Sequence, residues 1–160
     1  MPGAGPVPFA LGDFTPYLIA RVGALMEQTI TPTLKPAGLT IDMWRVLMVL
    51  RFNGPMNLVA LSRNTGVTTP TLSRMVGRLI ERGLVSRRRS SGDTRAVQVR
   101  LRAKGEALFE KLWPKVSMLE ALVTSGFDTV ELARFKSDLR SIQTVLLAEL
   151  EDARMARGRR

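Results

Sequence analysis

The sequence contains no cysteine and no histidine among its 160 residues. Without cysteine there is no disulfide, no thiol redox switch and no thiolate metal site. Without histidine the chain lacks the commonest metal ligand and the usual general base near neutral pH. No pair of carboxylates has a catalytic spacing, and there is no glycine-rich phosphate or dinucleotide loop. These absences argue against an enzyme and predict neither a metal nor a cofactor.

Long apolar runs are also absent. The longest uninterrupted one, Val46 to Leu50, is too short to span a membrane and is bracketed by Arg45 and Arg51. Residues 1–13 have neither the basic start nor the apolar centre of a signal peptide. The expected location is therefore the cytoplasm.

Acidic residues are scarce in one part of the chain. Between Arg63 and Lys104 there are eleven Lys or Arg but only two acids, Glu81 and Asp93, whereas the remaining residues are close to charge balance. This window carries +9 of the formal net charge of +10. Charge that serves only solubility would be spread over the surface. A focused positive patch attracts polyanions, and nucleic acid is the commonest such partner.

Apolar periodicity predicts a mainly helical fold with a small β-hairpin. Thr15, Thr40, Asn57, Thr69 and Asp128 are the expected helix N-caps, and Gly66 and Gly83 the expected helix ends. The predicted helices cover 16–34, 41–53, 58–65, 70–82, 103–125 and 129–153, and the predicted strands cover 84–88 and 97–101.

The helices over 58–65 and 70–82 are joined by a short glycine-bearing turn, which is the helix-turn-helix pattern. The hairpin that follows, with its tip at residues 90–93, is then a wing. In the second helix an apolar stripe turned inward leaves Thr71, Arg74 and Arg78 on the outer side, with Ser73 near their edge. The alternative is that this outer side is an ordinary solvent-exposed helix face without a function. The positive charge of the neighbouring wing argues against that alternative.

These outer residues predict a DNA-reading surface. Arginine commonly reads guanine in the major groove through a two-pronged contact, so Arg74, with Thr71 and Ser73, is expected to contact bases. Arg78 lies further along the helix and is expected to meet the DNA backbone. Thr68 and Thr69 stand at the helix start, where backbone N–H groups can bind a phosphate.

The wing adds Arg87, Arg88, Arg89 and Arg95 around Asp93. A hairpin of this size can lay its tip along the minor groove, whose narrow A·T stretches attract arginine. Asp93 would repel phosphate, so its expected task is to hold Arg95 by a charge-assisted pair. It could equally satisfy the backbone of its own turn, and the two roles are compatible.

Three segments make the sequence resemble the MarR family of bacterial transcription regulators. They are Leu39-Thr-x-x-x-Trp-x-Val-Leu47, the helix end from Leu79 to Val85, and the wing over 93–101 followed by Lys104-Gly105. The resemblance covers roughly residues 39–105 by motif. Two positions depart from the family pattern: Thr94 replaces a usual Arg in the wing, and Arg102 stands where Thr is common.

The resemblance implies a single domain over 1–160 with a winged helix-turn-helix lobe at 36–101. Segments 12–35 and 102–154 would form a helical dimerisation lobe, with flexible tails at 1–11 and 155–160. Similar proteins are homodimers that bind palindromic operators in double-stranded DNA, and many release DNA on binding a small phenolic or aromatic-acid ligand. The apolar positions of the terminal helices fit a dimer, although an intramolecular bundle is the alternative.

By analogy with those regulators, an effector would lie where the helical and DNA-binding lobes meet. The candidate residues are Arg21, Trp44, Arg45, Met48 and Trp113. Arginine could pair with an aromatic carboxylate. The alternative is that the Trp and Met residues belong to the core and the arginines are solvated.

The sequence thus predicts a dimeric, sequence-specific DNA-binding regulator, most simply a repressor. A non-specific architectural DNA-binding protein would use the same charge but show no preferred sequence and a steep salt dependence. The third alternative is that the chain is the winged-helix dimerisation module of an enzyme. The sequence argues against it, because no catalytic domain is expected in these residues.

Overall fold

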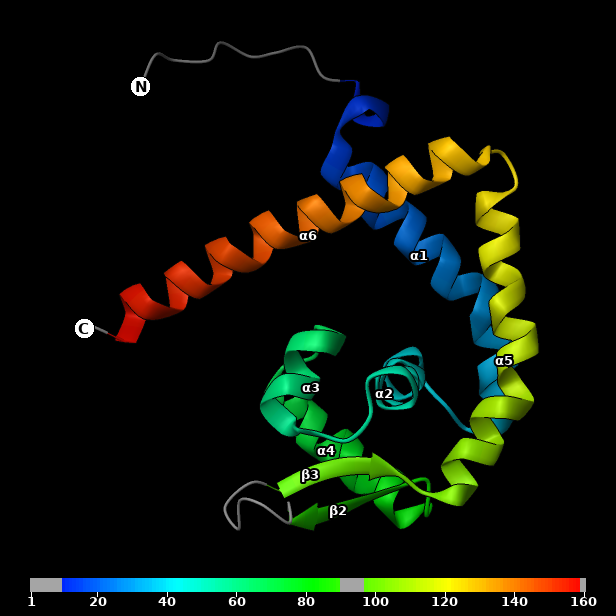
Figure 1. Cartoon of the computed structure of the whole chain (residues 1–160), viewed down its shortest axis with the longest axis vertical. Helices are drawn as coiled ribbons and strands as arrows, with labels where there is room; N and C mark the ends of the chain where they lie inside the picture. The colour runs from blue at the N-terminus through cyan, green and yellow to red at the C-terminus, as the bar shows by residue number, and fades with distance from the viewer. Residues whose placement is uncertain (1–9, 90–96, 159–160) are drawn as a thin grey trace. The chain divides into compact units, whose positions relative to one another are not determined.

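The computed structural model describes residues 10–89 and 97–158, and its contacts divide the chain into two compact units, residues 1–119 and residues 120–160 (Figure 1). Helix α5 runs across the boundary between them. In chain order the elements are η1 (Leu11–Asp13), α1 (Thr15–Leu34), η2 (Lys35–Ala37), α2 (Ile41–Asn53), β1 (Met56–Asn57), α3 (Leu58–Thr65), α4 (Thr69–Glu81), β2 (Val85–Arg89), β3 (Val97–Leu101), α5 (Ala103–Thr124) and α6 (Thr129–Gly158).

The architecture is mainly α-helical with one small antiparallel sheet, as the sequence predicts. Strand β3 lies between β1 and β2, and the β2–β3 register sets Val85 opposite Leu101 and Arg87 opposite Val99. The short strand β1 is not predicted, because its two residues are too few to show alternation. The expected hairpin tip at residues 90–93 lies outside the described residues.

Side-chain caps fix three of the predicted helix starts. The Thr40 hydroxyl accepts a hydrogen bond from the Met43 N–H at 3.2 Å, and the Asn57 side chain accepts one from the Ala60 N–H at 2.8 Å. At the start of α6 the Asp128 carboxylate accepts the Glu131 N–H at 2.8 Å, while Glu131 accepts the Asp128 N–H at 3.0 Å. This reciprocal pair is a capping box.

The predicted N-cap of α1 is wrong by one residue. Thr15 is already helical, and Phe14 is the N-cap, because the Leu18 N–H donates to the Phe14 carbonyl at 3.1 Å. Pro16 then occupies the first turn, where its missing N–H has no intrahelical partner to lose.

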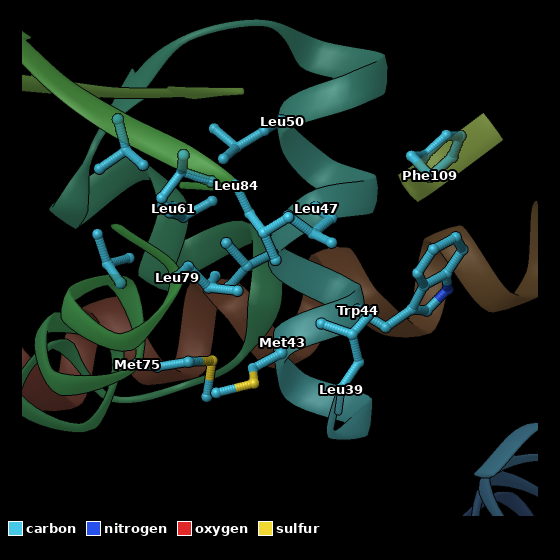
Figure 2. Packing of buried hydrophobic residues seen from close by; sticks show 14 of the residues in the cluster. Leu39, Met43, Trp44, Leu47, Leu50, Leu61, Met75, Leu79, Leu84 and Phe109 are labelled. Carbon is cyan, nitrogen blue, oxygen red and sulfur yellow. The ribbon is translucent and has the colours of Figure 1, made fainter. Parts of the chain in front are cut away.

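The first unit has one continuous core, shown in Figure 2. The buried stripe of α4 is packed against side chains of α2, α3 and the sheet. Leu47, Leu61 and Leu79 are fully buried. The view also places the side chains of Met43 and Met75 against each other. The fully buried apolar residues of this core further include Val46, Leu72, Val76, Val85 and Val99.

Helix α5 turns one face toward the core. Gly105, Phe109, Leu112 and Val116 are buried on this face, whereas Leu108 is only partly buried. Phe109 joins this face to α2, because its ring stacks on Trp44.

The second unit contains the end of α5 and the whole of α6 within its described residues. The Phe127 and Phe135 rings stack at 5.1 Å, which packs the turn against the first part of α6. The helix continues to Gly158, so residues 155–158, expected in a tail, are helical. Ala, Arg and Met dominate this stretch and are strong helix formers. Among the described residues, no helix is long and apolar enough to cross a membrane.

Gly105 permits a close approach of two backbone segments in the first unit. A Cβ atom placed there would lie 2.1 Å from the Leu84 carbonyl oxygen. We therefore expect Gly105→Ala to lower the free energy of unfolding by about 1–3 kcal/mol, because backbone has to shift to admit the methyl group. Urea unfolding of the full chain measures this.

Gly77→Ala in α4 is the matched control, because a Cβ atom at that position would have no neighbouring atom within 4 Å. It should leave stability unchanged or raise it by up to about 1 kcal/mol, as expected for Gly to Ala in a helix interior. Equal stability of the two variants would show that the Gly105 contact is not a constraint.

Candidate nucleic-acid interface

Helix α4 is amphipathic, with one apolar side and one polar side. Leu72, Val76 and Leu79 are fully buried, whereas Thr71, Arg74 and Arg78 lie on the opposite, solvent-facing side. Because the apolar stripe is held in the core, the polar side has to face outward. These three outer residues are those that the sequence assigns to DNA contact, and the structure brings them together on one helix face.

The start of α4 is open to an anion. Thr68 is the N-cap but forms no side-chain cap, and its hydroxyl instead donates to Thr71 Oγ1 at 3.1 Å. Thr69, the predicted N-cap, is instead the first helical residue, and both Thr68 and Thr69 are exposed. The N–H groups of the first helical turn carry a partial positive charge, which suits a phosphate oxygen.

Ser73 and Arg87 connect α4 to the sheet. Arg87 Nη2 lies 3.3 Å from Ser73 Oγ and 3.5 Å from the Ser73 carbonyl oxygen, and donates to both. Arg87 stands opposite the buried Val99 in the β2–β3 register, on the side of the strand from which it reaches α4. The Ser73 hydroxyl therefore already has a partner within the protein.

Strand alternation separates the wing arginines. Successive side chains of β2 point to opposite faces, so Arg88 faces away from the side on which Arg87 reaches Ser73. Arg89 ends β2, whereas Asp93, Thr94 and Arg95 lie outside the described residues. The pairing expected between Asp93 and Arg95 stays a prediction.

Two of the five candidate effector residues, Trp44 and Trp113, belong to an aromatic stack. The Trp44 ring is stacked on Phe109 with a centroid distance of 4.9 Å, and Phe109 is stacked on Trp113 at 5.3 Å. Phe52 packs edge-on against both Phe109 and Trp113. Met48 is partly buried against the same core. Trp44 is 1% exposed, and within the described residues its Nε1 has no hydrogen-bond partner.

The two candidate arginines differ in their surroundings. Arg45 forms ion pairs with Glu27 of α1 and, at 2.8 Å, with Asp42. Its guanidinium is thus already matched by carboxylates. Arg21 is exposed on α1, and the ion pairs found in the described part of the chain do not include it.

Sequence reasoning missed two contributors to this region, Phe109 and Glu27. The signal for Phe109 was its spacing of four from Trp113, which places both rings on one face of α5. No local pattern could have paired Glu27 with Arg45, because they lie on different helices. Among the described residues no group of three or more His, Cys, Asp or Glu could hold a metal ion.

Comparison with known proteins identifies the fold and the family. A sequence model described as the MarR family matches residues 39–97. The HTH-type transcriptional regulator FarR of Neisseria gonorrhoeae is 33% identical over 138 residues, covering 85% of this chain and 89% of FarR. The HTH-type transcriptional repressor Rv2887 of Mycobacterium tuberculosis is 28% identical, covering 82% of this chain and 96% of that protein.

Solved structures agree with this assignment. A MarR family transcriptional regulator from Silicibacter pomeroyi has a TM-score of 0.79 and 26% identity, covering 85% of this chain and 91% of that one. The structure of NadR in complex with 4-hydroxyphenylacetate has a TM-score of 0.74 and 27% identity, covering 88% of this chain and 98% of that one.

The aromatic stack yields a stability prediction. Phe109 is 2% exposed between two indole rings, so Phe109→Ala should lower the free energy of unfolding by about 3–5 kcal/mol. Phe52→Ala removes a ring that is 60% exposed and should cost about 1 kcal/mol. Urea unfolding followed by tryptophan fluorescence compares them, and equal costs would contradict a central position for Phe109.

Proposed function

Because this chain belongs to the MarR family of winged helix-turn-helix transcription regulators, we propose that it acts as a homodimeric repressor on a palindromic operator in double-stranded DNA. Its relatives are named as transcription regulators and repressors, and it is a regulator rather than an enzyme. The proposed location is the cytoplasm, at the nucleoid when DNA is bound. The observation that carries the proposal is the polar face of α4 above its buried stripe.

Sequence-specific reading is favoured by the chemistry of that face. Arg74 and Arg78 supply charge, and Thr71 between the helix start and Arg74 supplies a short polar side chain for base edges. The open N-terminus of α4 at Thr68 and Thr69 suits a phosphate that would fix the register on the duplex. A protein that binds DNA without sequence preference needs only positive charge. A face that combines arginine with threonine therefore favours binding to a specific operator.

Arg87 is proposed to act in two ways. Its hydrogen bonds to Ser73 hold β2 against α4, which orients the reading helix relative to the wing. Its guanidinium also adds charge beside the reading helix. Arg88, on the opposite strand face, is the better placed of the two for the DNA backbone beside the wing. Arg89, Asp93 and Arg95 are proposed wing contacts from the sequence alone.

Dimerisation is supported by apolar surface on the terminal helices. On α1, Leu18, Val22 and Leu25 are exposed. On α6 the exposed apolar residues recur at helical spacing: Phe135, Leu139, Ile142, Leu146 and Leu150. Contiguous apolar surface of this kind usually marks an interaction site. A two-fold dimer would place two α4 helices about 34 Å apart, one turn of DNA, and so require a palindromic site.

A small phenolic or aromatic acid is the proposed effector. NadR, which has this fold, was crystallised with 4-hydroxyphenylacetate. In this chain Met48 and Trp113 are partly exposed and offer apolar and aromatic surface, and the Nε1 of the buried Trp44, without a partner among the described residues, would offer a donor to a ligand that opens the stack. Arg21 would receive the carboxylate directly, whereas Arg45 would first have to release Glu27 or Asp42.

The DNA face is tested by Arg74→Ala. Loss of one two-pronged base contact should weaken binding to the selected operator by about 1–3 kcal/mol and relax one base position. The operator is first selected from random duplexes at physiological salt, and affinity is then measured by fluorescence anisotropy. Arg140→Ala, an exposed arginine of α6, is the charge-matched control and should bind nearly as wild type.

The outcome separates the alternatives. A palindromic consensus with half-sites about one turn apart supports the operator reading. Tight binding without a consensus, with a steep salt dependence, would replace it with the architectural one. Wild-type affinity of the Arg74 variant would show that α4 does not read the bases.

The proposed dimer is tested by Leu139→Glu with Leu146→Glu. Placing two carboxylates on the apolar stripe of α6 should shift the chain to a monomer, because burying unpaired charge is strongly unfavourable. Sedimentation velocity measures the mass, and circular dichroism checks that the helices persist. Ser137→Glu with Thr144→Glu adds the same charge at exposed positions on the opposite side of α6 and should leave the dimer intact. A dimer unaffected by the double change would place the interface elsewhere.

A further inference from the structure

A cleft of about 350 Å³ lies where the end of α4 meets the start of α5, away from the aromatic stack. All of its charged residues are cations, and all of its apolar residues are aliphatic. It is lined by Ala37, Arg82, Leu84, Lys104, Ala107, Leu108 and Lys111. The DNA contacts and the effector proposed above use none of these residues.

The backbone around this cleft is closely fixed. The Leu84 carbonyl accepts the Arg102 N–H at 3.0 Å, and Gly105 admits no side chain beside it. The Lys104 Cδ lies 3.8 Å from the position a Cβ would take on Gly83. Lys104 and Lys111 are two helical turns apart and therefore lie on one side of α5. The cation arrangement follows from the close approach of Leu84, which follows α4, to the start of α5.

The two lysines have no acidic partner within the described part of the chain. The ion pairs found there involve Arg45, Arg51 and Lys136, and none involves Lys104 or Lys111. Arg82 is held by neutral oxygens: it donates to the Gly38 carbonyl at 2.7 Å and to the Ala37 carbonyl at 2.6 Å. Three like charges around one aliphatic surface leave an unmatched positive site.

Two simpler explanations cover only part of this arrangement. Cations near the C-terminus of α4 are favoured by the helix dipole, which accounts for Arg82 but not for Lys111 two turns into α5. A DNA phosphate would use the charge but gain nothing from Leu84 and Leu108, which are buried and partly buried. A ligand that uses both features needs an anionic group and an apolar body.

We propose that this cleft binds a small aliphatic carboxylate, with its carboxylate on Lys104 and Lys111 and its chain on Leu84 and Leu108. The described lining residues include no aromatic ring, which distinguishes this ligand class from the aromatic acid proposed for the Trp44 region. Aliphatic surface removed from water and charge-assisted hydrogen bonds would contribute together.

The position of Arg82 links the cleft to DNA binding, a consequence that rests on the proposed function. Arg82 directly follows α4 and ties it to the segment after α1 through Ala37 and Gly38. Arg82 lines the same cleft as Lys104 and Lys111, so a carboxylate held by the two lysines would also attract the Arg82 guanidinium and compete with these carbonyls for it. Occupancy therefore changes how the end of the reading helix is held, and we expect it to lower operator affinity.

Isothermal titration of the full chain with octanoate tests the site. Wild type should bind saturably, and Lys104→Ala with Lys111→Ala should weaken binding by about tenfold or more, as expected for lost charge-assisted contacts. Lys115→Ala with Arg140→Ala removes the same charge from exposed positions outside the cleft and should bind as wild type. Thermal melts confirm that all variants are folded.

Two further probes test the ligand class. Octanol lacks the charge and inorganic phosphate lacks the chain, so each should bind more weakly than octanoate. Equal octanoate affinity of wild type and the Lys104/Lys111 variant would overturn the site. Phosphate binding as tight as octanoate would overturn the amphipathic ligand. Loss of DNA binding in that variant, with no octanoate binding to wild type, would reassign the lysines to DNA.

Operator binding is then measured with and without octanoate. Weaker binding by wild type, but not by the Lys104/Lys111 variant, supports the link through Arg82. Octanoate binding without any change in operator affinity would overturn that link and leave both the cleft and the repressor proposal standing. Failure of the chain to bind any DNA would overturn the repressor proposal, while the calorimetric test of the cleft still holds.

Discussion

The candidate DNA-reading surface depends on burial of the apolar stripe of α4. Each fully buried side chain of that stripe gains about 1.5–3 kcal/mol from leaving water. Rotating the helix would expose several of them at once, for example Leu72 and Leu79. The core therefore fixes which residues face outward, and Arg74 and Arg78 need no contacts of their own to be held on that side. Reading specificity can then vary at the surface without altering the fold.

A second constraint acts at the junction of α4, β2 and α5. Gly83 adopts a left-handed conformation with φ of 72°, and the Leu84 N–H returns to the Leu79 carbonyl at 2.9 Å, which ends α4 and redirects the chain. Gly105 then lets α5 approach this reversal at backbone distance. Gly83 and Gly105, which are far apart in the sequence, thus create one tight junction. The cation-lined cleft is a by-product of that junction, since Arg82 and Lys104 flank it.

Local chemistry made most of the fold predictable. Caps such as Thr40 and Asn57, the terminator Gly66 and the stripe of α4 act within one or two turns, so they can be read from neighbouring residues. Features that depend on partners far along the chain were not predicted. Phe109 joins α5 to α2 through its stack on Trp44, and β1 exists only because β3 pairs with it. For the same reason the contacts of Ser73 with Arg87 and of Arg45 with Glu27 could not be foreseen.

Asn57 belongs to two elements at once. Its backbone position pairs with Gln98 of β3, and its side chain caps α3 through the Ala60 N–H. A single residue therefore couples the base of the wing to the first helix of the helix-turn-helix. Bending the base of the wing would strain that cap. Strands β2 and β3 and helices α3 and α4 should therefore move together as one rigid body, with any hinge outside them.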